Sequence, residues 1–312
     1  GERGGALHKR RFGALELLFL RFAAGGAIPA GWFLADLPSA AERAARTGRL
    51  SLEVVSHCWG YAHLLVYQLS SLVQHPPQSL DVTMTVFYCV EDEETVELLD
   101  HFGAFEIPGV AWNWKALPRQ ELFRRAIGRN IAALETKADW IWFTDCDLMF
   151  QGGCLDALAE RLQGRTEALL FPREERCTSL LRSSDPLLQV GKDGPRVVQL
   201  ETEKFTVRER TKATGPLQIT HGDVARAAGY CRDLGLYQQP SETWCKAYED
   251  RAFRWLLRTQ GTPIELPGVY RLRHAEKGRY TGSTSGLAWL RGVIRRLTSW
   301  FDERGLRGER AE

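Results

Sequence analysis

The chain has 312 residues, of which 44% are hydrophobic and 26% charged, and this composition excludes a disordered, collagen-like or low-complexity chain. Its 41 basic and 39 acidic side chains give a formal net charge of +2, which argues against a dedicated nucleic-acid-binding protein. The length predicts one large domain or two small ones.

The cysteines predict a reducing environment. Their number, seven, is odd, their spacing is irregular, and no Cys-x-x-Cys pair occurs. Neither a structural zinc knot nor a secreted disulfide framework fits this pattern. We therefore expect reduced cysteines in a cytoplasmic protein.

Two segments near the ends of the chain have patterns that are found at membranes. The apolar stretch 13–35 contains Glu16, Arg21 and Pro29, which makes a spanning helix improbable and favours a short amphipathic helix. At the other end, residues 290–301 place apolar side chains on one helical face and arginines elsewhere. This basic helix either packs on the domain or lies peripherally on the inner face of a membrane, and both alternatives stay open.

Strand and helix patterns alternate along the first half of the chain. The predicted strands are 50–58, 81–90, 138–150 and 167–172, and the predicted helices are 61–74, 91–102, 119–136 and 155–162. The segment around Pro108, Gly109 and Pro118 is predicted to be a loop. Such alternation indicates an α/β fold, with a mostly parallel sheet flanked by helices and right-handed crossovers.

The second half of the chain is less regular and predicts a smaller mixed region beside the sheet. Loops and short antiparallel strands are expected over 173–216, including 197–200 and 205–208, then helices at 222–230 and 249–258 and a strand at 264–272. The expected organisation is an N-terminal helical extension (1–49), a main domain (50–275) and a C-terminal basic amphipathic helix with a tail (276–312).

The strongest local signal is the carboxylate pair of Asp145-Cys146-Asp147, which follows a nearly continuous apolar run. In open parallel sheets, ligands gather at the carboxyl ends of the strands. Carboxylates beside a buried strand are costly unless they are neutralised, and Mn²⁺ or Mg²⁺ would do so because both prefer oxygen ligands. The alternative is a pair of loop carboxylates that accept hydrogen bonds from backbone N–H groups.

Four segments occur in an order found in one enzyme family: VVSHCWGYAHLLVYQLSSLVQ (54–74), IGRNIAALETKADWIWFTDCD (127–147), EDRAFRWLLRTQG (249–261) and RLRHA (271–275). In this order they resemble glycosyltransferase family 2 and its relatives with the GT-A (Rossmann-like) fold, which transfer a sugar from a nucleotide diphosphate donor. The chain departs from the family at His57-Cys58-Trp59-Gly60, where a Tyr-Asn is frequent, and at 219–230, where the usual run of small residues is replaced.

The resemblance implies a metal-dependent, inverting transfer. It places Mn²⁺ or Mg²⁺ on Asp145, Asp147 and His274, as a Lewis acid for the leaving diphosphate. It makes Asp250, with Glu249 beside it, the general base for the acceptor hydroxyl, although two acidic residues are also common at a helix N-terminus. The side chains expected to contact the donor are Ser56, His57, Trp59, Glu91, Arg129, Asp145 and Trp244.

The expected substrates are a nucleotide-diphosphate sugar, with UDP favoured over GDP, and an acceptor glycan, glycolipid or other hydroxyl compound. Two other functions stay open. One is a non-catalytic GT-A-fold protein that binds a membrane or a partner through its terminal helices, and the other is a metal-dependent nucleotidyltransferase or phosphohydrolase. The sequence contains no G-x-x-x-x-G-K-[ST], G-x-S-x-G or H-E-x-x-H motif.

Overall fold

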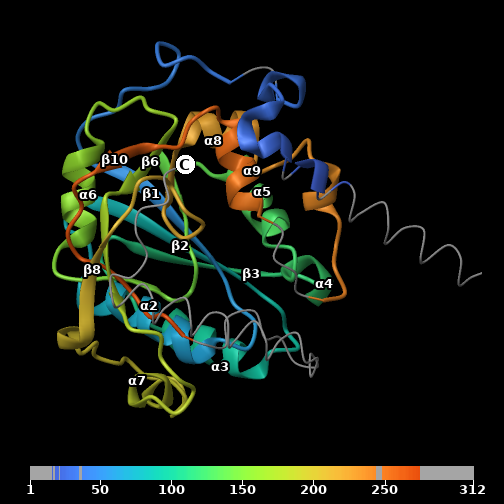
Figure 1. Ribbon diagram of the computed structural model, residues 1–312. Helices are drawn as coiled ribbons and strands as arrows, with labels where there is room; N and C mark the ends of the chain where they lie inside the picture. The colour runs from blue at the N-terminus through green and yellow to red at the C-terminus, as the bar shows by residue number, and fades with distance from the viewer. Residues whose placement is uncertain (1–15, 17, 21, 35–36, 244–247, 275–312) are drawn as a thin grey trace, which may run out of the picture.

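The computed structural model describes residues 16, 18–20, 22–34, 37–243 and 248–274. The predicted helix at 290–301 and the side chain of Trp244 lie outside these residues, so both stay predictions. The described chain has a large sheet with helices packed against it, and a second, smaller sheet beside it (Figure 1).

The large sheet has seven strands in the order β10-β6-β9-β4-β1-β2-β3. Its strands are β1 (Leu50–His57), β2 (Leu80–Tyr88), β3 (Val110–Ala116), β4 (Trp140–Phe143), β6 (Leu169–Pro172), β9 (Gln218–His221) and β10 (Thr262–Ile264). Only β9 runs antiparallel to its neighbours, β4 and β6. The prediction of a mostly parallel α/β sheet is therefore confirmed.

Helices flank the large sheet on two sides. Figure 1 shows α2 (Ala62–Gln74) and α3 (Glu93–Gly103) on one side, and α5 (Arg125–Glu135), α8 (Gly222–Ala228) and α9 (Glu249–Leu256) on the other. The remaining helices are α4 (Arg119–Leu122), α6 (Cys154–Leu162), α7 (Pro186–Val190), the π-helix η1 (Ala23–Ala27), and the 3₁₀ helices η2 (Ala30–Trp32), η3 (Thr202–Lys204) and η4 (Gly235–Gln238). The side chains of the central strands are buried on both faces. The sequence of β4 is accordingly apolar throughout, whereas β1 also buries the polar side chains of Glu53 and Ser56.

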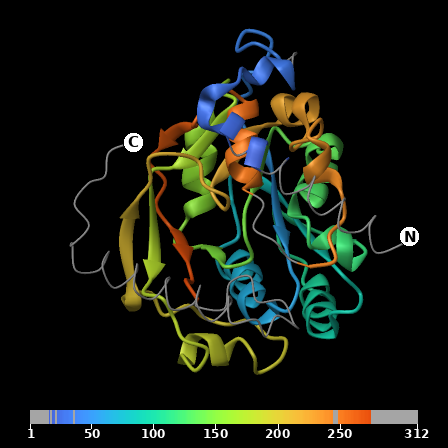
Figure 2. The ribbon, with the colours of Figure 1, turned by 45° about the vertical axis from the view of Figure 1, so that its right-hand side comes forward.

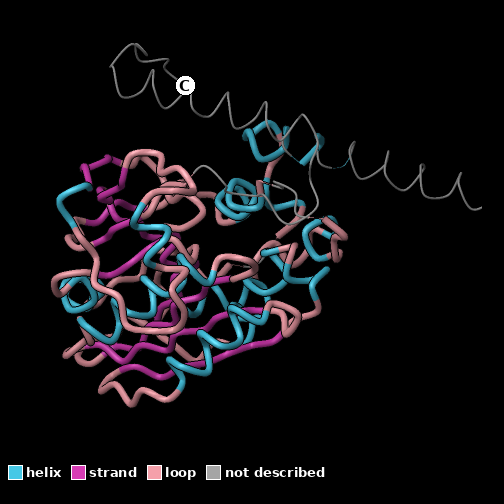
Figure 3. Tube along the Cα trace, turned by 90° about the horizontal axis from the view of Figure 1, so that it is seen from below, coloured by secondary structure: helices cyan, strands magenta, loops and turns pink. Residues whose placement is uncertain are grey.

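The second sheet has four strands in the order β5-β11-β7-β8 and lies to the left of the large sheet in Figure 2. The strands are β5 (Leu148–Phe150), β7 (Glu174–Thr178), β8 (Phe205–Glu209) and β11 (Val269–Arg271). Long loops connect the elements of this half of the chain. Figure 3 shows the loops of the described chain in pink, between the cyan helices and the magenta strands. The predicted mixed region is thus confirmed as a separate small sheet.

Several predicted elements differ from those observed. The predicted strand at 138–150 is two strands, β4 and β5, in different sheets, and the predicted strand at 264–272 is also two, β10 and β11, because Pro267 and Gly268 (φ +82°) turn the chain between them. The predicted helix at 119–136 is divided into α4 and α5. Strands β3 and β9 were not predicted, and residues 197–200 form no strand.

The described part of the N-terminal segment packs on the main domain through α9. Its backbone carbonyls accept hydrogen bonds from Arg251 to Ala24 (3.2 Å), from Trp255 to Ile28 (2.9 Å) and from Arg258 to Leu34 (2.8 Å). No helix in the described ranges is long and apolar enough to cross a membrane.

Gly128 lies where α5 crosses the end of β1. A Cβ atom at this position would overlap His57 Nε2 and would lie 3.0 Å from Phe87 Cγ. We expect Gly128→Ala to lower the free energy of unfolding by about 1–3 kcal/mol, because the cost of overpacking exceeds the gain in helix propensity. Urea titration measures this, with Gly235→Ala as the control because its Cβ would meet no atom within 4 Å. Equal stability of the two variants would contradict the prediction.

Candidate active site

The carboxylates of Asp145 and Asp147 lie in the turn that takes the chain from the large sheet to the small one. β4 ends at Phe143, where Thr144 N–H donates to Val55 O of β1 at 3.0 Å. Leu148 N–H donates back to Asp145 O at 3.2 Å, which closes the turn before β5. The turn therefore stands at the carboxyl ends of β1 and β4, where ligands bind in sheets of this kind.

A buried glutamine on α2 holds this turn in place. Nε2 of Gln68 donates to the backbone carbonyls of Asp145 (3.1 Å) and Leu148 (2.8 Å). The hydroxyl of Ser56 donates to Gln68 Oε1 at 2.6 Å, which fixes the amide orientation. Ser56 is fully buried, so its side chain supports the turn rather than facing the space where a nucleobase was predicted.

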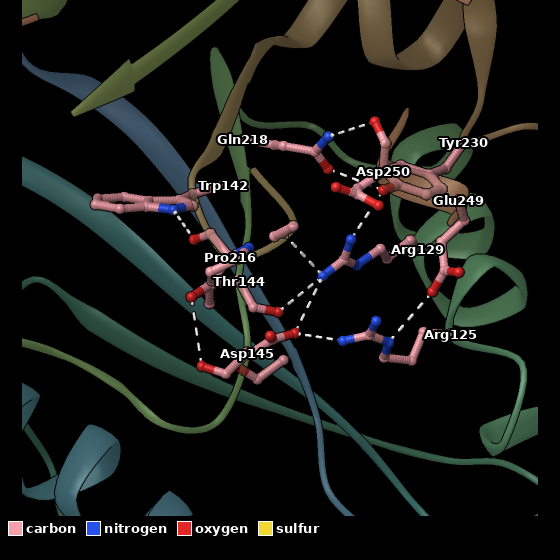
Figure 4. A network of polar contacts seen from close by, with 12 residues as sticks. Arg125, Arg129, Trp142, Thr144, Asp145, Pro216, Gln218, Tyr230, Glu249 and Asp250 are labelled. Atoms are coloured by element: carbon pink, nitrogen blue, oxygen red, sulfur yellow. Dashed lines mark hydrogen bonds and ion pairs between the residues drawn. The ribbon is translucent and has the colours of Figure 1, made fainter. Parts of the chain in front are cut away.

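Arg125 joins two carboxylates that are far apart in the sequence (Figure 4). Its Nη1 is 2.6 Å from Asp145 Oδ1, and its Nε is 3.2 Å from Glu249 Oε1. Arg125 begins α5 and Glu249 begins α9, so two helix N-termini and the end of β4 meet here. Because the two carboxylates share one guanidinium, their side chains are held in one network.

Arg129, one turn further along α5, is fully buried. Its guanidinium donates to Tyr230 Oη (2.8 Å), and to the carbonyls of Thr144 and Gly215 (both 3.1 Å), and it lies 3.5 Å from Asp145 Oδ1. These contacts hold Arg129 against the backbone of the turn and near Asp145, and its predicted contact with the diphosphate stays a prediction. Arg125, whose side chain is 26% exposed, is the more accessible arginine.

The residue between the carboxylates, Cys146, is buried and carries a neutral thiol. Its hydrogen bond to the thiol of Cys58 and its burial raise the pKa of Cys146 well above its ordinary value. A thiol that stays protonated at neutral pH is a poor metal ligand. The hard oxygens of this turn are therefore its available ligands. Six cysteines, all buried, are free in the described part of the chain.

Strand β11 brings the predicted metal ligand His274 back to the turn. Leu272 N–H donates to Asp147 O at 2.9 Å, two residues before His274. Both Asp147 and His274 are 3% exposed, and the imidazole lies edge-on to Tyr61. No set of three or more His, Cys, Asp or Glu side chains within the described ranges could hold a metal by itself. Mg²⁺ and Mn²⁺ sites are often completed by substrate phosphates and water, and two protein ligands fit such a site.

The two acidic residues of α9 have different surroundings. Glu249 is 5% exposed and is bound to Arg125. The Asp250 side chain is 33% exposed, lies 3.5 Å from Arg254, and has its Cβ near Gly215, whose carbonyl accepts from Arg129. Asp250 is thus the accessible carboxylate of the pair, while Glu249 belongs to the Asp145 network.

Aromatic and charged side chains gather beyond the ends of β1 and β2, where the nucleobase was predicted. Trp59 packs edge-on against Phe123 (5.5 Å between centroids), and the guanidinium carbon of Arg119 is 6.0 Å from its ring centroid. The exposed Glu91 is 3.0 Å from Arg119 Nη1. Trp59 and Glu91 therefore share Arg119 as a neighbour. Arg119 was not among the site residues predicted from the sequence.

His57, at the end of β1, stacks on Phe87 with ring centroids 5.0 Å apart. Both ring nitrogens are buried and have no hydrogen-bond partner in the described structure. Burial, together with the charges of Arg129 and Arg125, lowers the pKa of His57 well below its ordinary value. The ring is therefore neutral in the folded protein and belongs to the packing beneath α5.

The low pKa of His57 predicts a loss of stability in acid. Below about pH 6.5 the unfolded chain binds a proton that the folded chain does not, so the free energy of unfolding falls by up to about 1.4 kcal/mol per pH unit. His57→Asn should flatten the dependence of Tm on pH between 7.5 and 5.5. The half-buried His75, which follows α2, provides the control variant His75→Asn. Equal pH slopes for His57→Asn and the unmodified protein would contradict the prediction.

No protein-family model matches the chain, and no curated protein matches it. Among solved structures, a mannosyltransferase from Pyrobaculum calidifontis in complex with GDP-Man and Mn²⁺ is 15% identical, with 97% of this chain and 75% of that chain covered and a TM-score of 0.42. TarS (1–349) of S. aureus is 12% identical, with 81% of this chain and 72% of that chain covered and a TM-score of 0.46. The same TarS fragment in complex with UDP is 11% identical, with 81% of this chain and 66% of that chain covered and a TM-score of 0.47.

Proposed function

We propose that the chain is a metal-dependent, inverting glycosyltransferase that transfers a sugar from a nucleotide diphosphate to a hydroxyl acceptor. The observation that carries the proposal is the network of Asp145, Arg125 and Glu249. It unites the Asp-Cys-Asp turn and the acidic pair of α9, two motifs that the sequence resemblance to glycosyltransferase family 2 assigns to one site. Their position at the carboxyl ends of β1 and β4 supports the same proposal.

In this proposal the donor lies over the turn between β4 and β5. Asp147 and His274 would hold Mn²⁺ or Mg²⁺, which supplies Lewis-acid stabilisation of the charge that develops on the leaving diphosphate. Asp145 is fixed by Arg125 and Arg129 and would contact the sugar or ribose of the donor. The base would stack beside Trp59, near Arg119 and Glu91.

Asp250 is proposed as the general base. The base must reach the acceptor hydroxyl, and the side chain of Asp250 is 33% exposed whereas that of Glu249 is 7% exposed. Each of the two carboxylates has an arginine beside it, so exposure is what distinguishes them. Direct removal of the proton by a carboxylate implies a single displacement with inversion at the anomeric carbon. Glu249 would position Arg125, and through it Asp145.

Product analysis on a panel of UDP-, GDP- and CDP-sugars with Mn²⁺ tests the proposal, with simple alcohols as acceptors. Release of the nucleoside diphosphate with an inverted glycoside or free sugar supports a glycosyltransferase. Release of a nucleoside monophosphate would instead identify a phosphohydrolase. If every donor stays intact and none binds, the chain is a non-catalytic protein of this fold.

A further inference from the structure

One face of the small sheet gathers arginines around a single glutamate. In the strand register, Glu175 of β7 lies opposite Arg208 of β8, and Cys177 of β7 lies opposite Arg271 of β11. Residues directly opposite each other share a face of a sheet, and so do residues two apart on one strand. These residues therefore share one face of the sheet, and Arg210, just beyond β8, reaches Glu175 from the same side.

The positive charges on this face exceed the negative ones. Glu175 is fully buried and its Oε1 accepts from Arg210 Nε (2.6 Å), from Arg210 Nη2, and from Arg271 Nη2 (2.8 Å). The side chain of Arg208 forms no hydrogen bond or ion pair with any described residue. Three guanidinium groups thus face one carboxylate, which leaves two positive charges unmatched within the cluster.

Two guanidinium N–H groups on this face are buried without an acceptor. They are the Nε groups of Arg208 and Arg271. A buried donor without an acceptor is costly, and a bound water or ion is one of the ways in which native proteins satisfy it. Arg208 and Arg210 are only partly buried, so a ligand can reach them from solvent.

The arginine face adjoins the candidate active site. Although burial lowers the pKa of Arg271, the charges of Glu175 and Asp147, and more weakly that of Asp145, raise it above its ordinary value. Arg271 also pairs across the sheet with Leu148, the residue that follows Asp147. Even when Asp147 is counted against Arg271, one arginine charge stays unmatched.

We propose that Arg208, Arg210 and Arg271 form an anion subsite beside the Asp145–Asp147 turn, and that it holds a phosphate group of a substrate. Arginine forks match phosphate oxygens, and the positive charge that stays unmatched on this face favours an anion. This inference rests on the proposed transferase function only where it calls the ligand a substrate. The phosphate belongs either to the donor's diphosphate or to a phosphate-bearing acceptor.

Binding of inorganic phosphate in metal-free buffer, at constant ionic strength, tests the subsite. Arg208→Gln should weaken phosphate binding by roughly tenfold or more, the loss expected for one charge-assisted hydrogen bond. The matched control is Arg176→Gln, since Arg176 is exposed on the opposite face, over the ring of Tyr270. Equal phosphate affinity in Arg208→Gln and the unmodified protein, or an equal loss in Arg176→Gln, overturns the proposal.

Two further arms complete the experiment. If Arg208→Gln does not fold, Arg208→Lys replaces it, because lysine keeps the positive charge but lacks the paired N–H groups of the guanidinium. Unchanged phosphate affinity in Arg208→Lys overturns the subsite. Titration with UDP and GDP identifies the source: a parallel loss in Arg208→Gln assigns the phosphate to the donor, and a loss for inorganic phosphate alone assigns it to the acceptor. Phosphate binding is measured without turnover, so a protein that binds phosphate at this subsite but transfers no sugar can be recognised.

Discussion

An Asp147→Ala variant is expected to lose sugar transfer and the Mn²⁺-dependent part of nucleotide binding. The carboxylate of Asp147 would be one of two protein ligands of the cation, and its removal leaves a single imidazole. Substitutions that only touch a ligand cost about 10–100-fold in metal affinity or activity, so loss of a ligand itself should exceed about 100-fold.

Transfer rate and nucleotide affinity should be measured for Asp147→Ala with and without Mn²⁺. The Tm of the variant should be measured in the absence of both nucleotide and Mn²⁺. Because Asp147 is buried beside β11, Asp147→Asn is the control for folding, since it keeps the shape of the side chain. A folded Asp147→Ala that retains full activity, or an unmodified protein that works in excess chelator, would refute the metal role.

The second large effect is expected from Asp250→Asn. An amide keeps the shape of the side chain but cannot accept the proton, and general-base catalysis contributes about 10²–10⁴-fold. Turnover should fall by that order while donor affinity persists, because a group that acts only in the transition state affects kcat more than binding. The measurement is kcat together with nucleotide affinity in the same variant.

Glu249→Gln provides the comparison for Asp250→Asn, because it alters the neighbouring carboxylate, which binds Arg125. This change should weaken the hold of Arg125 on Asp145 and therefore affect donor binding as well as turnover. Near-normal turnover in Asp250→Asn with a selective loss of kcat in Glu249→Gln would assign the base to Glu249. Loss of nucleotide affinity in Asp250→Asn would show that Asp250 contacts the donor.

Elements with a strong pattern of their own could be predicted from the sequence. The apolar runs of β1 and β2 and the acidic start of α3 define those elements locally. By contrast, β9 belongs to the sheet only because β4 and β6 lie on either side of it, and β3 is a half-exposed edge strand. The division of 138–150 into β4 and β5 was not predictable from apolarity, since both strands are fully buried.

Part of the candidate site was predictable as well. The sequence resemblance assigned Asp145 and Glu249 to one site, and the structure joins them through Arg125. Arg125 itself was missed, although its spacing of four residues from Arg129 places both on one face of α5. Burial decided which arginine is accessible, and burial depends on the packing of α5 against Tyr230, a contact across about a hundred residues that no local pattern encodes.

The most direct test of the central claim is calorimetric titration of the protein with UDP, GDP and CDP, each with and without Mn²⁺. The claim is that a nucleoside diphosphate binds with a divalent cation at the Asp145–Asp147 turn. We predict that one of the three diphosphates binds in the presence of Mn²⁺, and that Asp147→Ala loses the increment that Mn²⁺ provides. Binding of none of them, or binding that is the same with Mn²⁺, without Mn²⁺ and in Asp147→Ala, would contradict the account.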